Sequence, residues 1–133
     1  MSSNDNQQNL LAIDDVMVAK AMQLIMTSFD RPLQVSDIVA SVGVSRRSLE
    51  RRFVTAIGRT LAEEIRRLRM EHARRLLLES DLTVSQIAPR CGYDYAEHFI
   101  AAFHRMMGEP PQRFRERMMR GWRGGRPASM NSF

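Results

Sequence analysis

Two stretches of this chain share one pattern: LQVSDIVASVG at residues 33–43 and LTVSQIAPRCG at residues 82–92. Each contains Leu-x-Val-Ser-x-Ile and reaches a glycine after four further residues. The residues that follow place apolar side chains four positions apart and end in a second glycine: Leu49, Phe53, Ile57 and Gly58 in the first copy, and Phe99, Phe103, Met107 and Gly108 in the second. A short helix, a glycine turn and a longer helix pinned by such apolar residues form a helix-turn-helix.

The repetition is what makes this prediction specific. A single copy would be weak evidence, because many helical hairpins share such a pattern. Two copies with the same internal spacing in a basic chain of 133 residues are much harder to reach by chance.

The remaining segments also carry helical signals, and no segment alternates apolar and polar residues as a strand does. Ser45 is expected to cap one helix, Thr60 and Glu63 to form a capping box at the start of the longest, and Asp94 to cap another. The sequence therefore predicts an all-α fold of seven helices. They cover about residues 14–29, 35–42, 46–57, 61–79, 81 or 83 to 91, 95–107 and 111–120.

The repeat predicts two helix-turn-helix subdomains joined by a long connector helix. Residues 13–59 form the first subdomain, residues 60–80 the connector and residues 81–120 the second subdomain. Residues 1–12 are expected to be a disordered arm or linker remnant, and residues 121–133 a disordered tail. A connector of about 19 residues is about 28 Å long, which suits the roughly 34 Å between successive major grooves if the DNA bends slightly.

The charge suggests a polyanionic partner. The chain carries 20 basic and 15 acidic residues, a formal net charge of +5. Ten arginines and four glutamates lie between Arg46 and Arg75, so the basic excess is concentrated there. Nucleic acid is the most frequent partner of such a surface. A solvated helical face, rich in arginine through codon usage, explains the charge equally well.

Other classes of function find little support. The chain has no run of about 18 apolar residues and no signal peptide, so we expect a cytoplasmic protein without a membrane partner. The single cysteine, Cys91, excludes an intramolecular disulfide and a zinc site built on paired cysteines. His72, His98 and His104 lack partners at metal-ligand spacing. With no catalytic set or phosphate-binding loop either, we expect no metal, no cofactor and no enzyme activity.

In the first repeat, Leu49 and Phe53 fix which side of the helix at residues 46–57 is buried. At about 100° per residue, Arg47 and Arg51 point away from that side. Two arginines one turn apart near the start of a recognition helix suit bidentate contacts to guanine. The competing interpretation is that both are surface arginines without base contacts.

Three further residues of this helix are candidates for DNA contacts. Glu50 could accept a hydrogen bond from cytosine or simply hold an arginine in place. Arg46 and Arg52 lie nearer the buried side and are better placed for phosphates.

The second repeat presents a different surface. Its outward positions are Glu97 and Ala101, flanked by His98, Ile100, His104 and Arg105. Glu97 and His98 are candidates for base contacts, and Arg105 for a phosphate. Ala101 and Ile100 are candidates for contact with a thymine methyl group. Pro89 should shorten or kink the preceding short helix. We therefore expect this unit to contribute less base readout and more shape or apolar contact.

Further motifs complete the pattern: Arg69-Met70-x-x-Ala73-x-x-Leu76-Leu77, Ile87-Ala88-x-x-Cys91-Gly92-Tyr93, Phe99-x-x-x-Phe103 and Gly108-x-x-Pro111-x-x-Phe114-Arg115. With them, the chain from about Ala21 to Arg117 resembles the C-terminal DNA-binding domain of AraC/XylS-type bacterial transcription regulators, those of xylose operons in particular. The resemblance implies a sequence-specific activator or repressor at the bacterial nucleoid, with double-stranded DNA as its partner.

By the same resemblance, the base-contacting positions are Arg47, Glu50 and Arg51 in the first recognition helix and Ala96, Glu97, His98 and Ala101 in the second. The phosphate candidates are Arg46, Arg52, Arg69, Arg105 and Arg115. RNA polymerase is a further candidate partner. A small-molecule effector is expected only through a sensing domain that this chain does not contain. The competing hypothesis is a helical protein-interaction module whose arginine-rich face meets an acidic partner.

Overall fold

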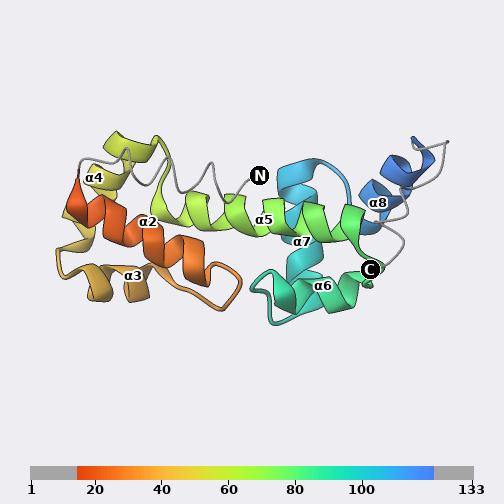
Figure 1. Cartoon of the computed structure of the whole chain (residues 1–133), viewed down its shortest axis with the longest axis horizontal. Coiled ribbons are helices and arrows are strands. Elements are labelled where there is room, and N and C mark those ends of the chain that lie inside the picture. The colour runs from red at the N-terminus through yellow and green to blue at the C-terminus, as the bar shows by residue number, and fades with distance from the viewer. Residues whose placement is uncertain (1–14, 122–133) are drawn as a thin grey trace. The chain divides into compact units, whose positions relative to one another are not determined.

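A computed structural model describes residues 15–121 of the chain. Within this range the fold is all-α, with seven helices and no strand, as predicted (Figure 1). The helices are α2 (Val16–Ser28), α3 (Val35–Val42), α4 (Arg46–Ile57), α5 (Leu61–Glu79), α6 (Val84–Arg90), α7 (Ala96–Met107) and α8 (Pro111–Arg120). The predicted arm at residues 1–12, and all of the predicted tail except residue 121, lie outside the described residues.

The ends of α4 and α5 follow their sequence signals. The Ser45 hydroxyl accepts a hydrogen bond of 3.1 Å from the backbone N–H of Ser48 and caps α4. Thr60 and Glu63 exchange side-chain-to-backbone bonds of 3.1 Å and 2.8 Å, which form the predicted capping box of α5. Gly58 ends α4 with a φ of +84°, a left-handed conformation that other residues adopt only with strain.

The start of α7 differs from the prediction. Asp94 does not cap a helix that begins at Tyr95, so that prediction is wrong: α7 begins at Ala96, and Tyr95 occupies the N-cap without a side-chain hydrogen bond to the helix. Because the helix begins one residue later than expected, the Asp94 carboxylate lies outside the position from which a side chain reaches the free N–H groups.

The short helix α6 is the counterpart of α3 in the second repeat. It begins after Thr83, whose hydroxyl accepts a hydrogen bond of 3.1 Å from the N–H of Gln86, so the later of the two predicted starts is confirmed. Pro89 lies inside the helix, which ends one residue further on at Arg90. Its seven residues, against eight in α3, agree with the expected shortening by proline.

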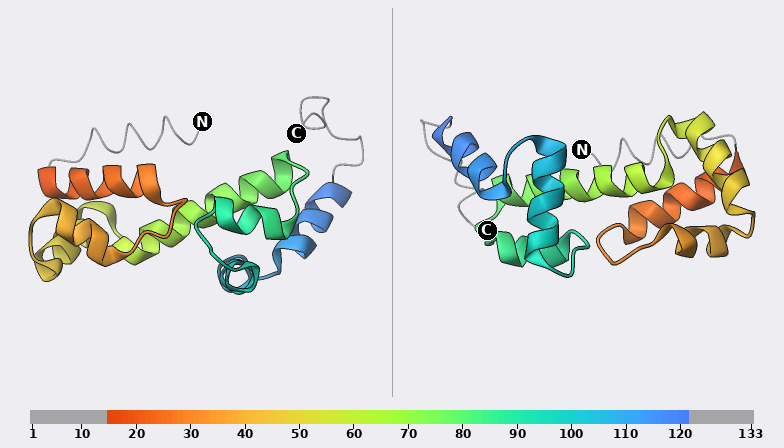
Figure 2. Two further views of the ribbon diagram at one scale, coloured as in Figure 1. Left: turned by 90° about the horizontal axis from the view of Figure 1, so that it is seen from below. Right: turned by 180° about the vertical axis from the view of Figure 1, so that it is seen from behind.

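The chain divides after Leu68 into two compact units, each with its own hydrophobic core. In the first unit, α2, α3, α4 and the N-terminal part of α5 surround the core (Figures 1 and 2). Leu49 and Phe53 of α4 are fully buried there with Ala21 and Ile25 of α2. The spacing of four therefore fixes the buried side of α4, as predicted.

The second unit builds an equivalent core from α6, α7, α8 and the C-terminal part of α5. Phe99 and Phe103 of α7 are fully buried, with ring centroids 6.0 Å apart. The Phe103 ring also meets Phe114 of α8 edge-on at 5.5 Å, a favoured geometry for aromatic pairs. The two phenylalanines of α7 thus have the role that Leu49 and Phe53 have in α4.

The C-terminal end of α5 is capped by a side chain from α8. Arg115 donates from Nε to the Leu77 carbonyl at 2.9 Å, and from a terminal nitrogen to the carbonyls of Ser80 at 3.3 Å and Leu76 at 3.5 Å. The last carbonyls of a helix have no partner within the helix and attract cations. Arg115 therefore ties α8 to α5 within the second unit.

Arg115→Ala should lower the free energy of unfolding by about 1–3 kcal/mol, because half-buried carbonyls lose their donor. Urea denaturation followed by circular dichroism measures the change. Arg113→Ala, at an exposed position of the same helix, is the matched control and should shift the value by less than about 0.5 kcal/mol. Equal effects of the two variants would show that Arg115 contributes only its charge.

Candidate nucleic-acid interface

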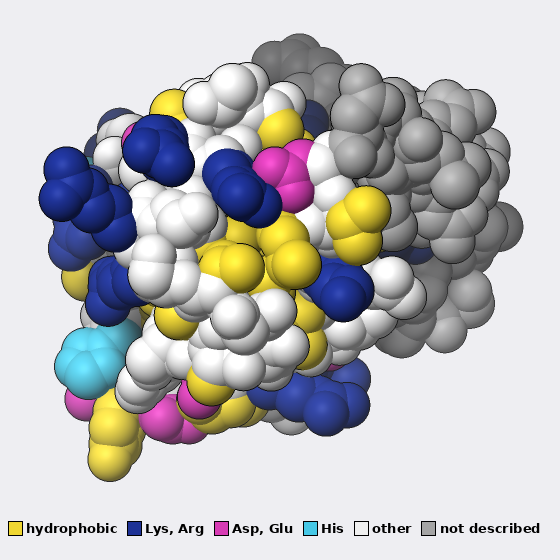
Figure 3. Space-filling view, turned by 90° about the vertical axis from the view of Figure 1, so that its left-hand side faces the viewer, with side chains coloured by type: hydrophobic (Ala, Val, Ile, Leu, Met, Phe, Trp, Pro, Cys, Tyr) yellow, Lys and Arg dark blue, Asp and Glu magenta, His cyan; other side chains and the backbone are white. Residues whose placement is uncertain are grey.

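The outer face of α4 carries the predicted base-reading arginines. Arg47 and Arg51 are both exposed, on the side of the helix away from the buried Leu49 and Phe53. Within the part of the chain that the structure describes, neither guanidinium has a side-chain partner. Lys and Arg side chains stand out on the face of the molecule in Figure 3, which shows the end where α4 lies. Both arginines are thus accessible to a ligand.

The other predicted contacts of α4 flank this face. Glu50 is half-buried and Arg46 is exposed at the first position of the helix. Arg52, with 44% of its side chain exposed, lies 3.9 Å from the carboxylate of Asp15, which caps α2. An exposed ion pair of this length is weak, so Arg52 can exchange Asp15 for a phosphate at little cost.

The outer face of α7 is chemically different. Glu97, His98 and Ala101 are exposed, and Ala96 is half-buried at the first position of the helix. Arg105 is exposed further along α7. The predicted base-reading positions of this helix therefore carry no arginine, whereas those of α4 include Arg47 and Arg51, one turn apart.

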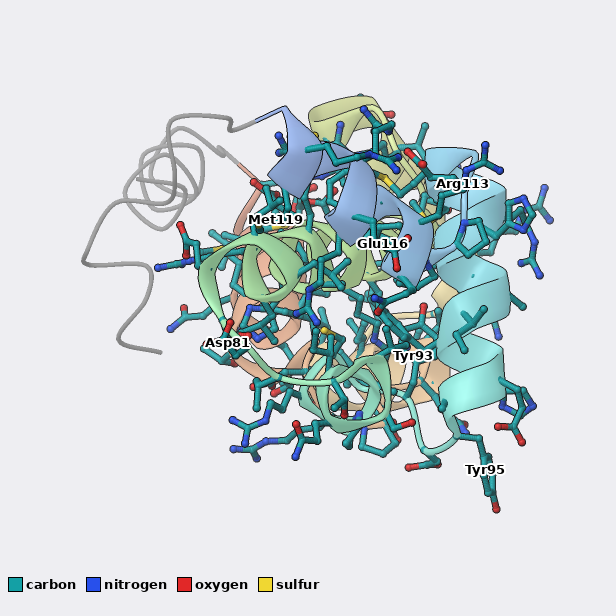
Figure 4. All side chains as sticks on the ribbon, turned by 90° about the vertical axis from the view of Figure 1, so that its right-hand side faces the viewer. Asp81, Tyr93, Tyr95, Arg113, Glu116 and Met119 are labelled. Atoms are coloured by element: carbon teal, nitrogen blue, oxygen red, sulfur yellow. The ribbon has the colours of Figure 1, made fainter. Side chains whose placement is uncertain are left out.

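Tyr95 is an exposed aromatic residue that sequence reasoning missed. Its side chain is 60% exposed, and its ring meets that of His98 edge-on with centroids 5.4 Å apart. It points outward from the start of α7, whereas Tyr93 packs against Phe99 (Figure 4). With Asp94 as the cap, the sequence predicts Tyr95 inside the helix and gives no reason to expect it at the exposed N-cap. Tyr95 adds a flat apolar surface and a hydroxyl beside a predicted base-reading residue.

The last two phosphate candidates have partners within the second unit. Arg69 is half-buried, with its guanidinium 5.4 Å from the centroid of the Tyr93 ring. Arg115 is also half-buried and binds the carbonyls at the end of α5. Both side chains thus contribute to the fold, and their contact with phosphate stays a prediction.

A buried carboxylate binds two arginines in the first unit. Glu64 is fully buried; its Oε1 accepts hydrogen bonds from Nε of Arg59 at 2.6 Å and Nε of Arg67 at 2.8 Å, and its Oε2 accepts one from a terminal nitrogen of Arg67 at 2.9 Å. Sequence reasoning did not find this cluster. The available signal was position: Glu64 lies three residues after Leu61 and four before Leu68, on the buried stripe of α5.

The two arginines keep Glu64 ionised. Burial raises the pKa of the Glu64 carboxyl, but hydrogen bonds from Arg67 and Arg59 outweigh burial and hold the pKa below its ordinary value of 4.5. One carboxylate thus accepts hydrogen bonds from two guanidinium groups at once.

Residues 15–121 contain neither a metal site nor a membrane span. No group of three or more His, Cys, Asp or Glu side chains in this range could hold a metal ion. None of the helices in the same range is both long and apolar enough to span a membrane. Cys91 is buried in the core of the second unit.

Known sequences place the chain in a family. The family model of a helix-turn-helix domain matches residues 38–117. The xylose operon regulatory protein of Escherichia coli (strain K12) is 30% identical over 105 residues, which are 79% of this chain and 27% of that protein. The transcriptional activator RhaR of Enterobacter sp. (strain 638) is 30% identical over 103 residues, 77% of this chain and 36% of that protein. The chain thus spans about a third or less of the length of these relatives.

Solved structures of related domains have similar folds. The C-terminal domain of AraT, a response regulator from Geobacillus stearothermophilus, has a TM-score of 0.74 at 31% identity, over 77% of this chain and 85% of that one. The DNA-binding domain of AdpA, solved in complex with a target DNA, has a TM-score of 0.75 at 26% identity, over 81% of this chain and 97% of that one. The chain belongs to the AraC-type helix-turn-helix family.

Glu64→Gln should lower the free energy of unfolding at neutral pH by about 1–3 kcal/mol, because the three charge-assisted hydrogen bonds from Arg59 and Arg67 weaken. The folded-state pKa of Glu64 is below 4.5, so its contribution is complete above that value and is lost as the pH falls through the folded-state pKa. The difference between wild type and variant should therefore shrink from about pH 7 to about pH 3. Urea denaturation at a series of pH values measures it, and a constant difference would contradict the assignment.

Proposed function

We propose that this chain binds double-stranded DNA sequence-specifically, as the DNA-binding domain of a bacterial transcription regulator with α4 and α7 as its recognition helices. The observation that carries this proposal is the exposed pair Arg47 and Arg51, held one turn apart on α4 by the buried Leu49 and Phe53. The relatives described above are named as regulators of transcription, and the AdpA domain was solved on a target DNA.

In the first recognition helix, Arg47 and Arg51 read guanine through bidentate contacts to O6 and N7. Glu50 accepts from cytosine N4 or steadies a neighbouring arginine. Arg46 and Arg52 bind phosphates at the edge of the groove, which sets the register of the helix without adding sequence preference.

In the second recognition helix, readout relies on smaller groups. Glu97 and His98 contact base edges, and Ala96 and Ala101 allow close approach to thymine methyl groups. Tyr95, exposed beside His98, widens this contact surface. Arg105, together with Arg69 and Arg115 elsewhere in the unit, supplies phosphate contacts in the proposal.

The two recognition helices occupy successive major grooves in this proposal. What supports it is α5, a single helix of 19 residues that runs from the first unit into the second. Its length of about 28 Å is near the groove repeat of about 34 Å. One chain then binds two half-sites, as a dimer of simpler repressors does.

At the level of the whole regulator, we propose activation of transcription with RNA polymerase as a protein partner. A small-molecule effector would act through a domain outside this sequence. The site of action is the nucleoid, and no enzymatic step is part of the proposal.

Selection of bound sequences from a random duplex pool, followed by salt titration, tests DNA binding. We expect one enriched motif and a steep loss of affinity as salt rises. An absence of binding at low salt would instead favour a protein-interaction module with an acidic partner.

Arg51→Ala should cost about 1–3 kcal/mol on the selected site and relax the preference at one or two base positions. The reason is the loss of a bidentate contact to guanine. Arg46→Ala is the comparison: it should weaken binding by a similar factor on every sequence, because phosphates carry no sequence information. Anisotropy titrations with the selected site and its single-base variants measure both. Uniform weakening by Arg51→Ala would reassign it to a phosphate.

Insertion of about five base pairs between the two half-sites should reduce the affinity to that of a site with one half destroyed. About half a helical turn moves the second half-site to the opposite side of the DNA, which a continuous α5 cannot follow. Gel-shift titrations of the spacing series measure the effect. Unchanged affinity would contradict simultaneous binding by both units of one chain.

A further inference from the structure

The Glu64 cluster contains none of the predicted base-reading residues, and burial of its carboxylate has a cost in desolvation free energy. Glu64 is fully buried, while the side chains of Arg59 and Arg67 that share its carboxylate are 42% and 36% exposed. An apolar residue at this position of the buried stripe would avoid the desolvation of a charge. Stability alone is therefore a poor explanation for the cluster. What the carboxylate does achieve is to fix the orientation of two guanidinium groups.

Glu64 uses only one edge of Arg59. Its Oε1 accepts the hydrogen bond from Nε at 2.6 Å, and the terminal nitrogens of Arg59 have no partner within residues 15–121. A guanidinium carries five N–H donors in a rigid plane. With Nε held, three of the four remaining N–H groups lie outside the edge that meets Glu64. A fixed and charged edge of this kind matches the oxygens of a phosphate.

Arg59 also lies at the end of the recognition helix where a phosphate contact is expected, directly after its C-terminus. It follows Gly58, which ends α4, whereas Arg47 and Arg51 are in the first half of the helix. The 12 residues of α4 span about 18 Å, and the major groove is about 12 Å wide. A helix that inserts its first half among the bases therefore extends its other end to the edge of the groove, where the phosphates lie.

We infer that Glu64, which Arg67 helps to keep ionised, is a positioning residue that holds Arg59 as a preoriented clamp for a phosphate of the DNA backbone next to the first recognition helix. This inference rests on the proposed function, in which α4 enters the major groove. The clamp adds affinity and fixes the register of α4, and it carries no sequence preference of its own.

Glu64→Gln separates orientation from charge, because the two effects have opposite signs. Loss of a negative charge tightens binding to a polyanion if net charge alone matters. If Glu64 orients Arg59, a neutral amide holds the guanidinium less firmly and binding weakens. We expect a weakening of about fivefold at about 0.15 M salt, equal on specific and unrelated duplexes, which corresponds to one phosphate contact. Fluorescence anisotropy over a salt series measures this, and the slope of log K against log salt should become shallower by about 0.9.

Arg59→Ala should produce the same loss and the same change of slope. The double variant with Glu64→Gln should be no worse than Arg59→Ala alone, because the carboxylate acts through that arginine. Matched controls remove the same charges elsewhere: Glu116→Gln on α8 and Arg66→Ala on α5, both at exposed positions. Glu116→Gln should not weaken binding, and Arg66→Ala should leave the salt slope unchanged.

The outcomes distinguish the clamp from the proposed function. Tighter binding by Glu64→Gln, or equal losses for Arg59→Ala and Arg66→Ala, would overturn the clamp while the wild type still binds DNA. Circular dichroism melts show whether each variant is folded under the conditions of binding. If Glu64→Gln is not folded, the comparison of Arg59→Ala with Arg66→Ala decides, since neither substitution removes an apolar side chain of the core and Glu64 keeps its hydrogen bonds from Arg67 in both variants. A wild type without salt-dependent DNA binding would overturn the proposed function instead.

Discussion

One pair of buried side chains, four residues apart in each recognition helix, determines what that helix presents to solvent. Leu49 and Phe53 anchor α4, and Phe99 and Phe103 anchor α7; all four are completely buried. At 3.6 residues per turn, two anchors on one side leave the helix no freedom to rotate about its axis. The position of a residue in the helix then determines whether its side chain faces outward. Any chemistry on these faces depends on this constraint.

The same constraint allows the two faces to differ. Outward residues contribute little to the core, so they can vary without loss of the fold. The outward residues of α4 include two arginines without side-chain partners in the described chain. Those at the start of α7 include His98, whose ring meets that of the N-cap residue Tyr95, and Ala101. The same scaffold therefore presents a pair of arginines on α4 and no arginine at the predicted base-reading positions of α7. Within our proposal, α4 supplies most of the base discrimination and α7 most of the contact by shape.

The helices could be predicted from the sequence because their signals are local. The box of Thr60 and Glu63 and the cap at Ser45 lie within four residues of the helix ends that they set. Contacts between distant residues escaped prediction: Arg115 reaches the Leu77 carbonyl across 38 residues, and no local pattern specifies that. Glu64 was missed for another reason, because a carboxylate on a buried stripe contradicts the hydrophobic rule used to locate the core.

The total number of arginines overstates the charge that a ligand would meet. Arg59 and Arg67 share Glu64, and Arg75 donates to Glu79 at 2.9 Å. The acidic residues thus hold several arginines in place. Their charge is partly neutralised, and the orientation of their guanidinium groups is fixed. Arg47 and Arg51 are left without such restraint in the part of α4 proposed to meet the bases, where a side chain has to adapt to a particular sequence. In this arrangement, arginines paired with a carboxylate have a fixed orientation that suits the uniform phosphate backbone of DNA. Arginines without such a partner can adapt to base edges that vary with sequence.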